Sequence, residues 1–131
     1  MNTIFLLSIG YWNLMGSIAL YLMLNKAIAD RLLREWTWII AAPYEVGRYG
    51  NLWLVWAATT NTFFGAINLF AAHWESMNQI AVIWADLFVY GVFLLSAIVV
   101  LKGNDYGKGH FINIGLFIFW SLWAVYLLVH H

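Results

Sequence analysis

The chain has 131 residues, of which 64% are hydrophobic and only 9% are Asp, Glu, Lys or Arg, with six basic residues balancing six acidic ones. A soluble domain is typically about 45–50% apolar and about 25% charged, so this composition predicts an integral membrane protein. The balanced charge leaves no basic patch for nucleic acid, and the absence of cysteine excludes disulfides and thiolate metal sites.

Four apolar stretches are long enough to form transmembrane helices, because about 20 mostly apolar residues cross the hydrocarbon core of a bilayer. They run over residues 4–24, 52–72, 79–101 and 111–130. The first stretch has no basic residue before it and is longer than the apolar part of a signal peptide, so we expect a retained helix. The expected fold class is therefore all-α, a single domain over residues 1–131 built as an integral membrane bundle of four transmembrane helices.

The connection between the first two spans is the longest loop. Two acid–base pairs at i,i+4 spacing support a helix there, and apolar residues recur on one side of it. This pattern predicts an amphipathic helix over residues 29–42 that lies in the membrane interface, or an extension of the first span that bends onto the interface. Pro43 is expected to end it.

The basic residues predict the orientation of the chain. All of them fall in the loops after the first and the third spans: Lys26, Arg31, Arg34, Arg48, Lys102 and Lys108. Loops rich in Lys and Arg stay in the cytoplasm. Both termini, and the turn over residues 73–78, are therefore expected on the non-cytoplasmic side.

Asparagines within the spans are the first candidate site residues, because polar groups inside a membrane are costly unless they find partners. Asn61 and Asn68 are seven residues apart on one face of the second span, with Gly65 between them, and Asn13 lies at similar depth in the first span. The favoured interpretation is a seam between helices, in which small residues allow close approach and amides bond across it. The alternative is the polar wall of a ligand or ion path. Asn13, Asn61 and Ser121 could also meet in one central polar layer.

Asp86 is the acidic residue expected inside a span, the third one. A carboxylate at that depth costs several kcal/mol unless it is paired, protonated or near water. The expected partners within the chain are Asn68, Tyr90, Tyr11 and Tyr126. Asp86 is interpreted as a structural carboxyl or a contact to another subunit, and alternatively as a group that couples transport to a proton or cation.

Histidines offer the remaining candidates for a cofactor. His73 and His130 are both expected near the outer surface, and two imidazoles from different helices could ligate a haem or a copper ion. Their peripheral positions argue against this, so no metal site and no cofactor are predicted. The chain has neither a Glu-x-x-His nor a His-Glu-x-x-His motif, which argues against a metal-dependent membrane enzyme.

These observations favour a small non-enzymatic accessory or scaffold subunit that packs against other proteins in a larger membrane complex. Its partners are then the lipid bilayer and other membrane subunits, or further copies of the chain. One alternative is a small dimeric proton-coupled transporter that uses Asp86. Four-helix multidrug exporters are similar to this chain in size and span number, but the acid in their first helix has no counterpart here. Another alternative is a protein that binds a lipid, quinone or pigment among its deep aromatic residues.

A scaffold role also follows from a loose resemblance. Residues 48–50 (Arg-Tyr-Gly) followed by Trp53, and residues 107–109 (Gly-Lys-Gly) before the fourth span, accompany a four-span layout with a long first loop. This layout resembles the sterol-synthesis scaffold family, endoplasmic-reticulum proteins that tether membrane enzymes. The polar residues expected late in the third span of that family are missing from this chain.

Overall fold

The structure is a computed structural model, and it describes residues 1–28, 31, 48–101 and 109–130. In these residues the long elements are four helices and no strand occurs: α1 (Asn2–Leu22), α3 (Arg48–Ala71), α4 (Ser76–Leu101) and α5 (Gly109–Val129). The all-α class is therefore confirmed for this part of the chain. The interfacial helix predicted over residues 29–42, and Pro43 at its end, lie outside the described residues apart from Arg31.

Three helical stretches are long and apolar enough to cross a membrane, namely Asn2–Leu22 in α1, Ser76–Ser96 in α4 and Ile112–Val129 in α5. They indicate a membrane protein. Helix α3 has 24 residues and is about 36 Å long at a rise of about 1.5 Å per residue. It is not one of the three, and residues 59–62 (Thr-Thr-Asn-Thr) place four polar side chains in succession near its middle.

The helices begin slightly before the apolar stretches do. They start at Asn2, Arg48, Ser76 and Gly109, whereas hydropathy places the starts at residues 4, 52, 79 and 111. Hydropathy detects the apolar run, but backbone hydrogen bonds extend each helix into the polar residues that precede it. The predicted turn over residues 73–78 is accordingly shorter, because α3 ends at Ala71 and α4 begins at Ser76.

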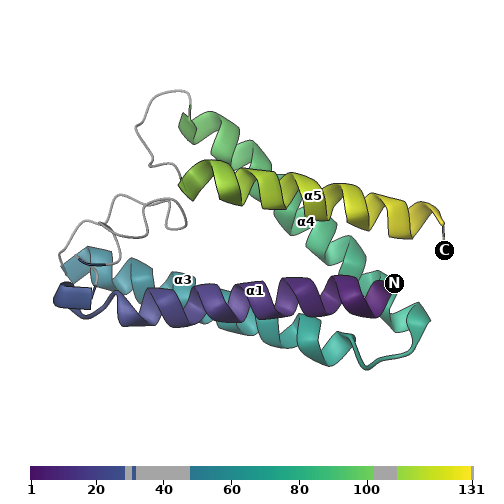
Figure 1. Ribbon diagram of the computed structural model, residues 1–131, viewed down its shortest axis with the longest axis horizontal. Helices are drawn as coiled ribbons and strands as arrows, with labels where there is room; N and C mark the ends of the chain where they lie inside the picture. Colours follow the sequence, from purple (N-terminus) through teal and green to yellow (C-terminus); the bar gives the residue numbers. More distant parts are fainter. Residues whose placement is uncertain (29–30, 32–47, 102–108, 131) are drawn as a thin grey trace.

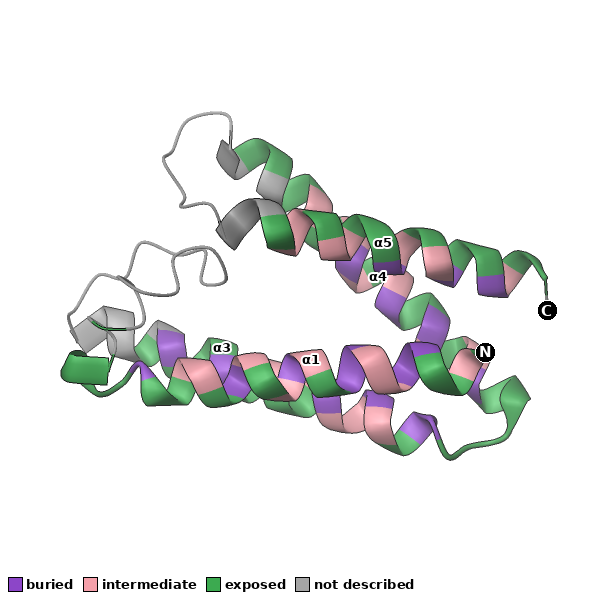
Figure 2. Ribbon diagram, viewed as in Figure 1, coloured by how far each residue is buried: buried purple, intermediate pink, exposed green. Residues whose placement is uncertain are grey.

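The helices form two antiparallel pairs. Helix α1 packs along α3, α4 packs against α5, and contacts between the two pairs are fewer (Figure 1). The N-terminus of α1, the α3–α4 turn and the C-terminal end of α5 all lie at one end of the molecule (Figure 1). We call it the terminal end. Among the described side chains of α4, the buried ones lie between Gln79 and Tyr90, in the part of the helix nearer the terminal end (Figure 2).

Close packing of α1 on α3 depends on two glycines that face each other. A Cβ atom added at Gly65 would lie 2.9 Å from the carbonyl oxygen of Gly10, and one added at Gly10 would lie 2.6 Å from Leu69 Cδ2. Further along the same seam, the hydroxyl of Ser17 donates to the carbonyl of Ala58 over 2.9 Å. The α1–α3 contact is thus a small-residue seam of the kind that membrane helices use to bring their backbones together.

Much of the described surface is apolar. Large hydrophobic side chains are exposed on all four helices, among them Ile18, Phe63, Phe88 and Leu122, each more than 60% exposed. A monomeric soluble protein rarely exposes contiguous apolar surface on this scale. In a bilayer the same side chains would meet lipid tails without cost, which agrees with the membrane character of the three apolar helices.

Candidate functional site

The polar side chains that the structure buries lie at contacts between helices. They are Asn13, Ser17, Asn68, Gln79 and Asp86, all at most 7% exposed. On α4 the buried positions Gln79, Ile83, Asp86 and Tyr90 follow one another at intervals of four, three and four residues. This spacing places them on one face of the helix, which is therefore the face that α4 turns toward the interior.

Asp86 and Asn68 form the centre of the candidate site. Both are completely buried, and Nδ2 of Asn68 donates to Oδ1 of Asp86 over 3.1 Å. The same amide nitrogen also donates to the carbonyl of Phe64, one turn earlier in α3. Asn68 is thus one of the partners expected for Asp86, and it joins α3 to α4 through a hydrogen bond to a carboxyl group.

This central pair is incompletely satisfied. Oδ1 of Asn68 and Oδ2 of Asp86 are both buried, and neither has a hydrogen-bond partner. Of the described residues, only Asn68 forms a hydrogen bond with the Asp86 side chain. Most buried polar atoms in proteins have a partner, so two free acceptors on one bonded pair require an explanation.

Asn13 and Tyr90 form a second polar contact, between α1 and α4. The amide of Asn13 donates to the hydroxyl of Tyr90 over 3.3 Å and to the carbonyl of Ile9 over 2.9 Å. Tyr90 lies one turn beyond Asp86 on the same face of α4, and its ring is 1% exposed. The polar groups of α1, α3 and α4 therefore come together on this face of α4, one helical turn apart.

Aromatic rings hold Tyr90 in place. Its ring stacks on Phe117 and Trp120 of α5, with ring centroids 5.3 and 5.2 Å apart, and meets Phe64 of α3 edge to face. The indole N–H of Trp120 in turn donates to the hydroxyl of Ser8 in α1 over 3.2 Å. Rings of α3, α4 and α5 thus form one aromatic cluster around Tyr90, and α1 adds Trp12, which meets Trp120 edge to face. These contacts fix the position of the tyrosine.

The remaining polar candidates do not join this site. Asn61 is half-buried beside Gly16 of α1, and its side chain makes no hydrogen bond to any described residue. Ser121 has a buried hydroxyl without a partner. Tyr11 and Tyr126, expected as partners of Asp86, are instead 59% and 46% exposed. The asparagines are therefore spread over several helix contacts, and the single central polar layer considered from the sequence does not form.

The histidines lie at the surface. His73 is exposed in the turn between α3 and α4, and His130 is exposed at the end of α5, stacked on Tyr126 with its Nδ1 2.9 Å from the Tyr126 carbonyl. Within the described parts of the chain, no three His, Cys, Asp or Glu residues come together as a metal site would require.

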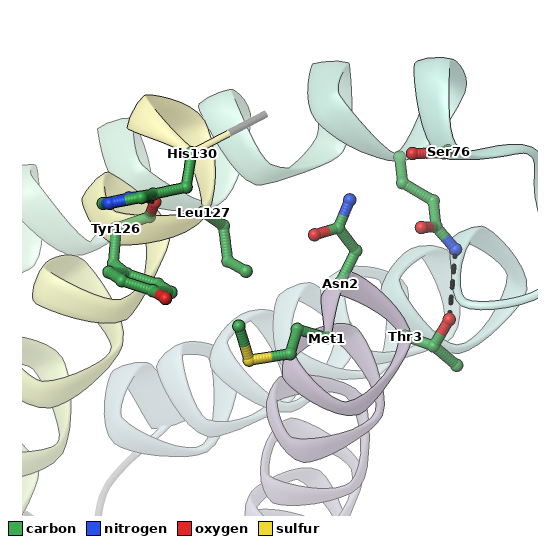
Figure 3. A pocket seen from close by; sticks show the side chains of 8 residues that line it. Met1, Asn2, Thr3, Ser76, Tyr126, Leu127 and His130 are labelled. Carbon is green, nitrogen blue, oxygen red and sulfur yellow. Dashed lines mark hydrogen bonds between the residues drawn. The ribbon is translucent and has the colours of Figure 1, made fainter.

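A pocket of about 390 Å³ opens at the terminal end of the molecule. Its lining comes from the start of α1, the start of α4 and the end of α5 (Figure 3): Met1, Asn2, Thr3, Ser76, Gln79, Tyr126, Leu127 and His130. Gln79 links this pocket to the buried face of α4. Its amide donates to the carbonyls of Ala71 and Ala72 at the end of α3, and makes a longer contact of 3.5 Å to Thr3.

Sequence reasoning missed three of these contacts. Gly10, Gln79 and the bond between Ser8 and Trp120 were not singled out, although each now joins two helices. For Gln79 a signal did exist, because it lies seven residues before Asp86 and hence on the same helix face. For Ser8 and Trp120 no such signal exists, since a serine or tryptophan within a span has no preferred partner until the packing is known.

The site can hold a hydrogen-bonded carboxyl group in an interior that lacks a cation among the described residues. In comparisons with models of protein families, with curated proteins and with solved structures, nothing matches this chain.

Proposed function

We propose that the protein is an accessory or scaffold subunit that packs against other subunits of a larger membrane complex, with α3 as a fourth transmembrane helix. The observation that carries the proposal is the side chain of Asn61. It lies near the middle of α3, is only half-buried, and has no hydrogen bond to any described residue. An amide in that position in a bilayer is stabilised when another helix supplies a donor and an acceptor.

The neighbourhood of Asn61 strengthens the argument. Thr59 and Thr60, which precede it, are both exposed, so polar side chains near the middle of α3 are accessible to another protein. The exposed side chains near the middle of α5, Ile118, Phe119 and Leu122, are apolar instead. The exposed threonines therefore support a protein contact at this part of α3, beside exposed apolar residues such as Phe63.

The proposal is tested by purifying the tagged protein from its own membranes in a mild detergent and identifying what copurifies by mass spectrometry. We expect a defined membrane protein in a fixed ratio, and we expect Asn61→Leu to lose it. The matched control is Ser96→Leu, which removes an exposed polar side chain from α4 instead. A stable, solitary homodimer, or equal retention of the partner in both variants, would contradict the proposal.

The orientation is a second part of the proposal. If α3 crosses the membrane, both termini and the α3–α4 turn lie on the non-cytoplasmic side, opposite the two basic loops. The antiparallel order of the helices, with the chain ends and this turn at one end of the molecule, supports this arrangement (Figure 1). It also agrees with the positions of the six Lys and Arg residues, which fall in the two other connections or at the start of α3.

Thiol labelling can test the orientation cleanly, because the chain has no cysteine of its own. We expect Glu75→Cys, in the exposed α3–α4 turn, to react with an impermeant maleimide added to intact cells. Asp105→Cys, in the loop before α5, should react only after the cells are permeabilised. If α3 does not cross the membrane, the Glu75→Cys variant is protected as well, and the four-span arrangement is wrong.

A small dimeric proton-coupled transporter is the second candidate, favoured by the complete burial of the Asp86 carboxyl group. On this hypothesis, purified protein in liposomes couples substrate movement to proton flux, and Asp86→Asn abolishes the coupling. Glu75→Gln, which changes an exposed acid in the turn, is the control and should retain it. Flux that is absent from the wild type, or unchanged in Asp86→Asn, would exclude this function.

A further inference from the structure

The two unsatisfied acceptors at the centre of the bundle belong to the same hydrogen-bonded pair. Asn68 Nδ2 donates to Asp86 Oδ1, which leaves Asn68 Oδ1 and Asp86 Oδ2 as the free oxygens, each buried and without a partner. Neither oxygen can satisfy the other while Asp86 is a carboxylate, because an amide oxygen and a carboxylate oxygen are both acceptors only. What the pair lacks is one donor.

No side chain near the pair supplies that donor. The titratable side chains described on the packed helices are tyrosines: Tyr11 and Tyr21 on α1, Tyr90 on α4 and Tyr126 on α5. The hydroxyl of Tyr90 accepts from Asn13, and it does not donate to either free oxygen of the pair, since neither oxygen has a hydrogen-bond partner. The other three tyrosines are exposed. The charged or imidazole groups described elsewhere, Lys26, Arg31, His73, Glu75 and His130, are exposed at the ends of the helices or beyond them.

We propose that Asp86 and Asn68 form a proton-binding site, in which a neutral Asp86 carboxyl group donates through Oδ2 to Asn68 Oδ1. The carboxyl group accepts from Asn68 Nδ2 at the same time, so the acid and the amide are joined by two reciprocal hydrogen bonds. One proton then satisfies both free oxygens. The step is simple binding, in which the proton comes from solvent and no other bond is made or broken.

A metal cation explains the pair less well. Hard cations such as Ca²⁺ bind six or more oxygen ligands and Mg²⁺ six, whereas only two free oxygens are present here. The neighbouring buried residues on this face of α4 are Ile83 and Tyr90, and the hydroxyl of Tyr90 is already engaged by Asn13. A proton requires only the two oxygens that the structure provides.

The site is separated from the pocket at the terminal end. Gln79 lines that pocket, and Asp86 lies seven residues further along the same helix, about 10 Å deeper at a rise of about 1.5 Å per residue. Ile83, which is 1% exposed, lies between them on the same face. The proton is therefore held behind a hydrophobic side chain, and its exchange with solvent requires local movement of α4.

Infrared spectroscopy of the purified protein at neutral pH tests the proposal directly. We expect a carbonyl stretching band of a protonated carboxylic acid that shifts when the three aspartates of the chain, Asp30, Asp86 and Asp105, carry ¹³C in their carboxyl groups. The band should be absent from Asp86→Asn and should shift in Asn68→Leu, where the hydrogen bonds to the acid are lost. A spectrum without an aspartic acid band at neutral pH, in labelled wild-type protein, would overturn the proposal.

A stability comparison provides an independent readout. The amide of Asp86→Asn offers an N–H donor where the neutral acid has its O–H, so this variant should unfold at the same fraction of denaturing detergent as the wild type. Asp86→Leu removes both hydrogen bonds from Asn68 and should unfold at a lower fraction. Equal losses in Asp86→Asn and Asp86→Leu would contradict a neutral acid. If sodium raises the unfolding midpoint of the wild type but not that of Asp86→Asn, the site binds a metal cation and the proposal of a bound proton is wrong.

Discussion

The contact between Gly10 and Gly65 makes the sharpest prediction about stability. In Gly65→Ala the new Cβ would lie 2.9 Å from the Gly10 carbonyl oxygen and 3.0 Å from Leu14 Cγ. The first obstacle is backbone, so it cannot move aside as a side chain can, and α1 and α3 must separate. Overpacking of this kind typically costs about 1–3 kcal/mol. The separation also stretches the bond from Ser17 to the Ala58 carbonyl further along the seam.

The same helices offer a matched control. Around Gly91 in α4 and Gly115 in α5, an added Cβ meets no atom within 4 Å. Gly91→Ala and Gly115→Ala should be neutral, or stabilising by up to about 1 kcal/mol, because alanine restricts the unfolded chain. Equilibrium unfolding in mixed micelles, followed by circular dichroism or tryptophan fluorescence, measures these differences. If Gly65→Ala is as stable as Gly91→Ala, the close approach of α1 and α3 is wrong.

Substitutions at three further residues address the contacts around the candidate site. Trp120→Phe keeps a ring beside Tyr90 but loses the hydrogen bond to Ser8. A double-mutant cycle of unfolding free energies with Ser8→Ala should give a coupling of about 0.6 kcal/mol, the average for such bonds in membranes. Additive effects of the two substitutions would show that the bond is absent. Tyr90→Phe should cost less than about 1 kcal/mol, because Asn13 keeps its bond to the Ile9 carbonyl. Tyr90→Ala should cost about 3–5 kcal/mol through the cavity it leaves, and near-equal unfolding midpoints for the two variants would contradict the packing. Gln79→Leu leaves the carbonyls of Ala71 and Ala72 without a side-chain donor, so hydrogen exchange in the α3–α4 turn should accelerate. Asn78→Leu, which changes the exposed neighbouring residue in the first turn of α4, should leave it unchanged.

The helices could be predicted from the sequence because apolar runs of about 20 residues have few other uses. Their ends could not be placed as well, since Asn2 and Ser76 are polar residues that extend α1 and α4 beyond the apolar run. Helix α3 shows a second limit of hydropathy, which concerns whether a helix is recognised as membrane-spanning at all. Its predicted span was placed over residues 52–72, but its polar middle keeps it out of the set of helices that composition alone identifies as membrane-spanning.

The candidate site could be predicted in part. Asn68 and Asp86 were selected because they are polar residues in apolar stretches, and the structure places them in contact. The pairing of Asn13 with Tyr90 could not be derived, because it depends on how α1 and α4 are rotated about their axes, and the sequence contains no such information. Asn61 satisfied the same rule as Asn68, yet no hydrogen bond joins it to any described residue of α4.

The polar side chains of α3 differ in whether the chain itself supplies their hydrogen-bond partners, and this difference bears on the function. Thr62 bonds to Ser17 of α1, and Asn68 bonds to Asp86 of α4, so these two side chains have partners within the chain. Asn61 has no hydrogen-bond partner among the described residues. If a subunit of the complex supplies that partner, α3 is an interior helix of the assembly, and its low hydropathy follows from that position. Amide hydrogen exchange in α3 should then slow when the partner copurifies, while exchange in α5 stays the same, and an equal effect on both helices would place the partner elsewhere.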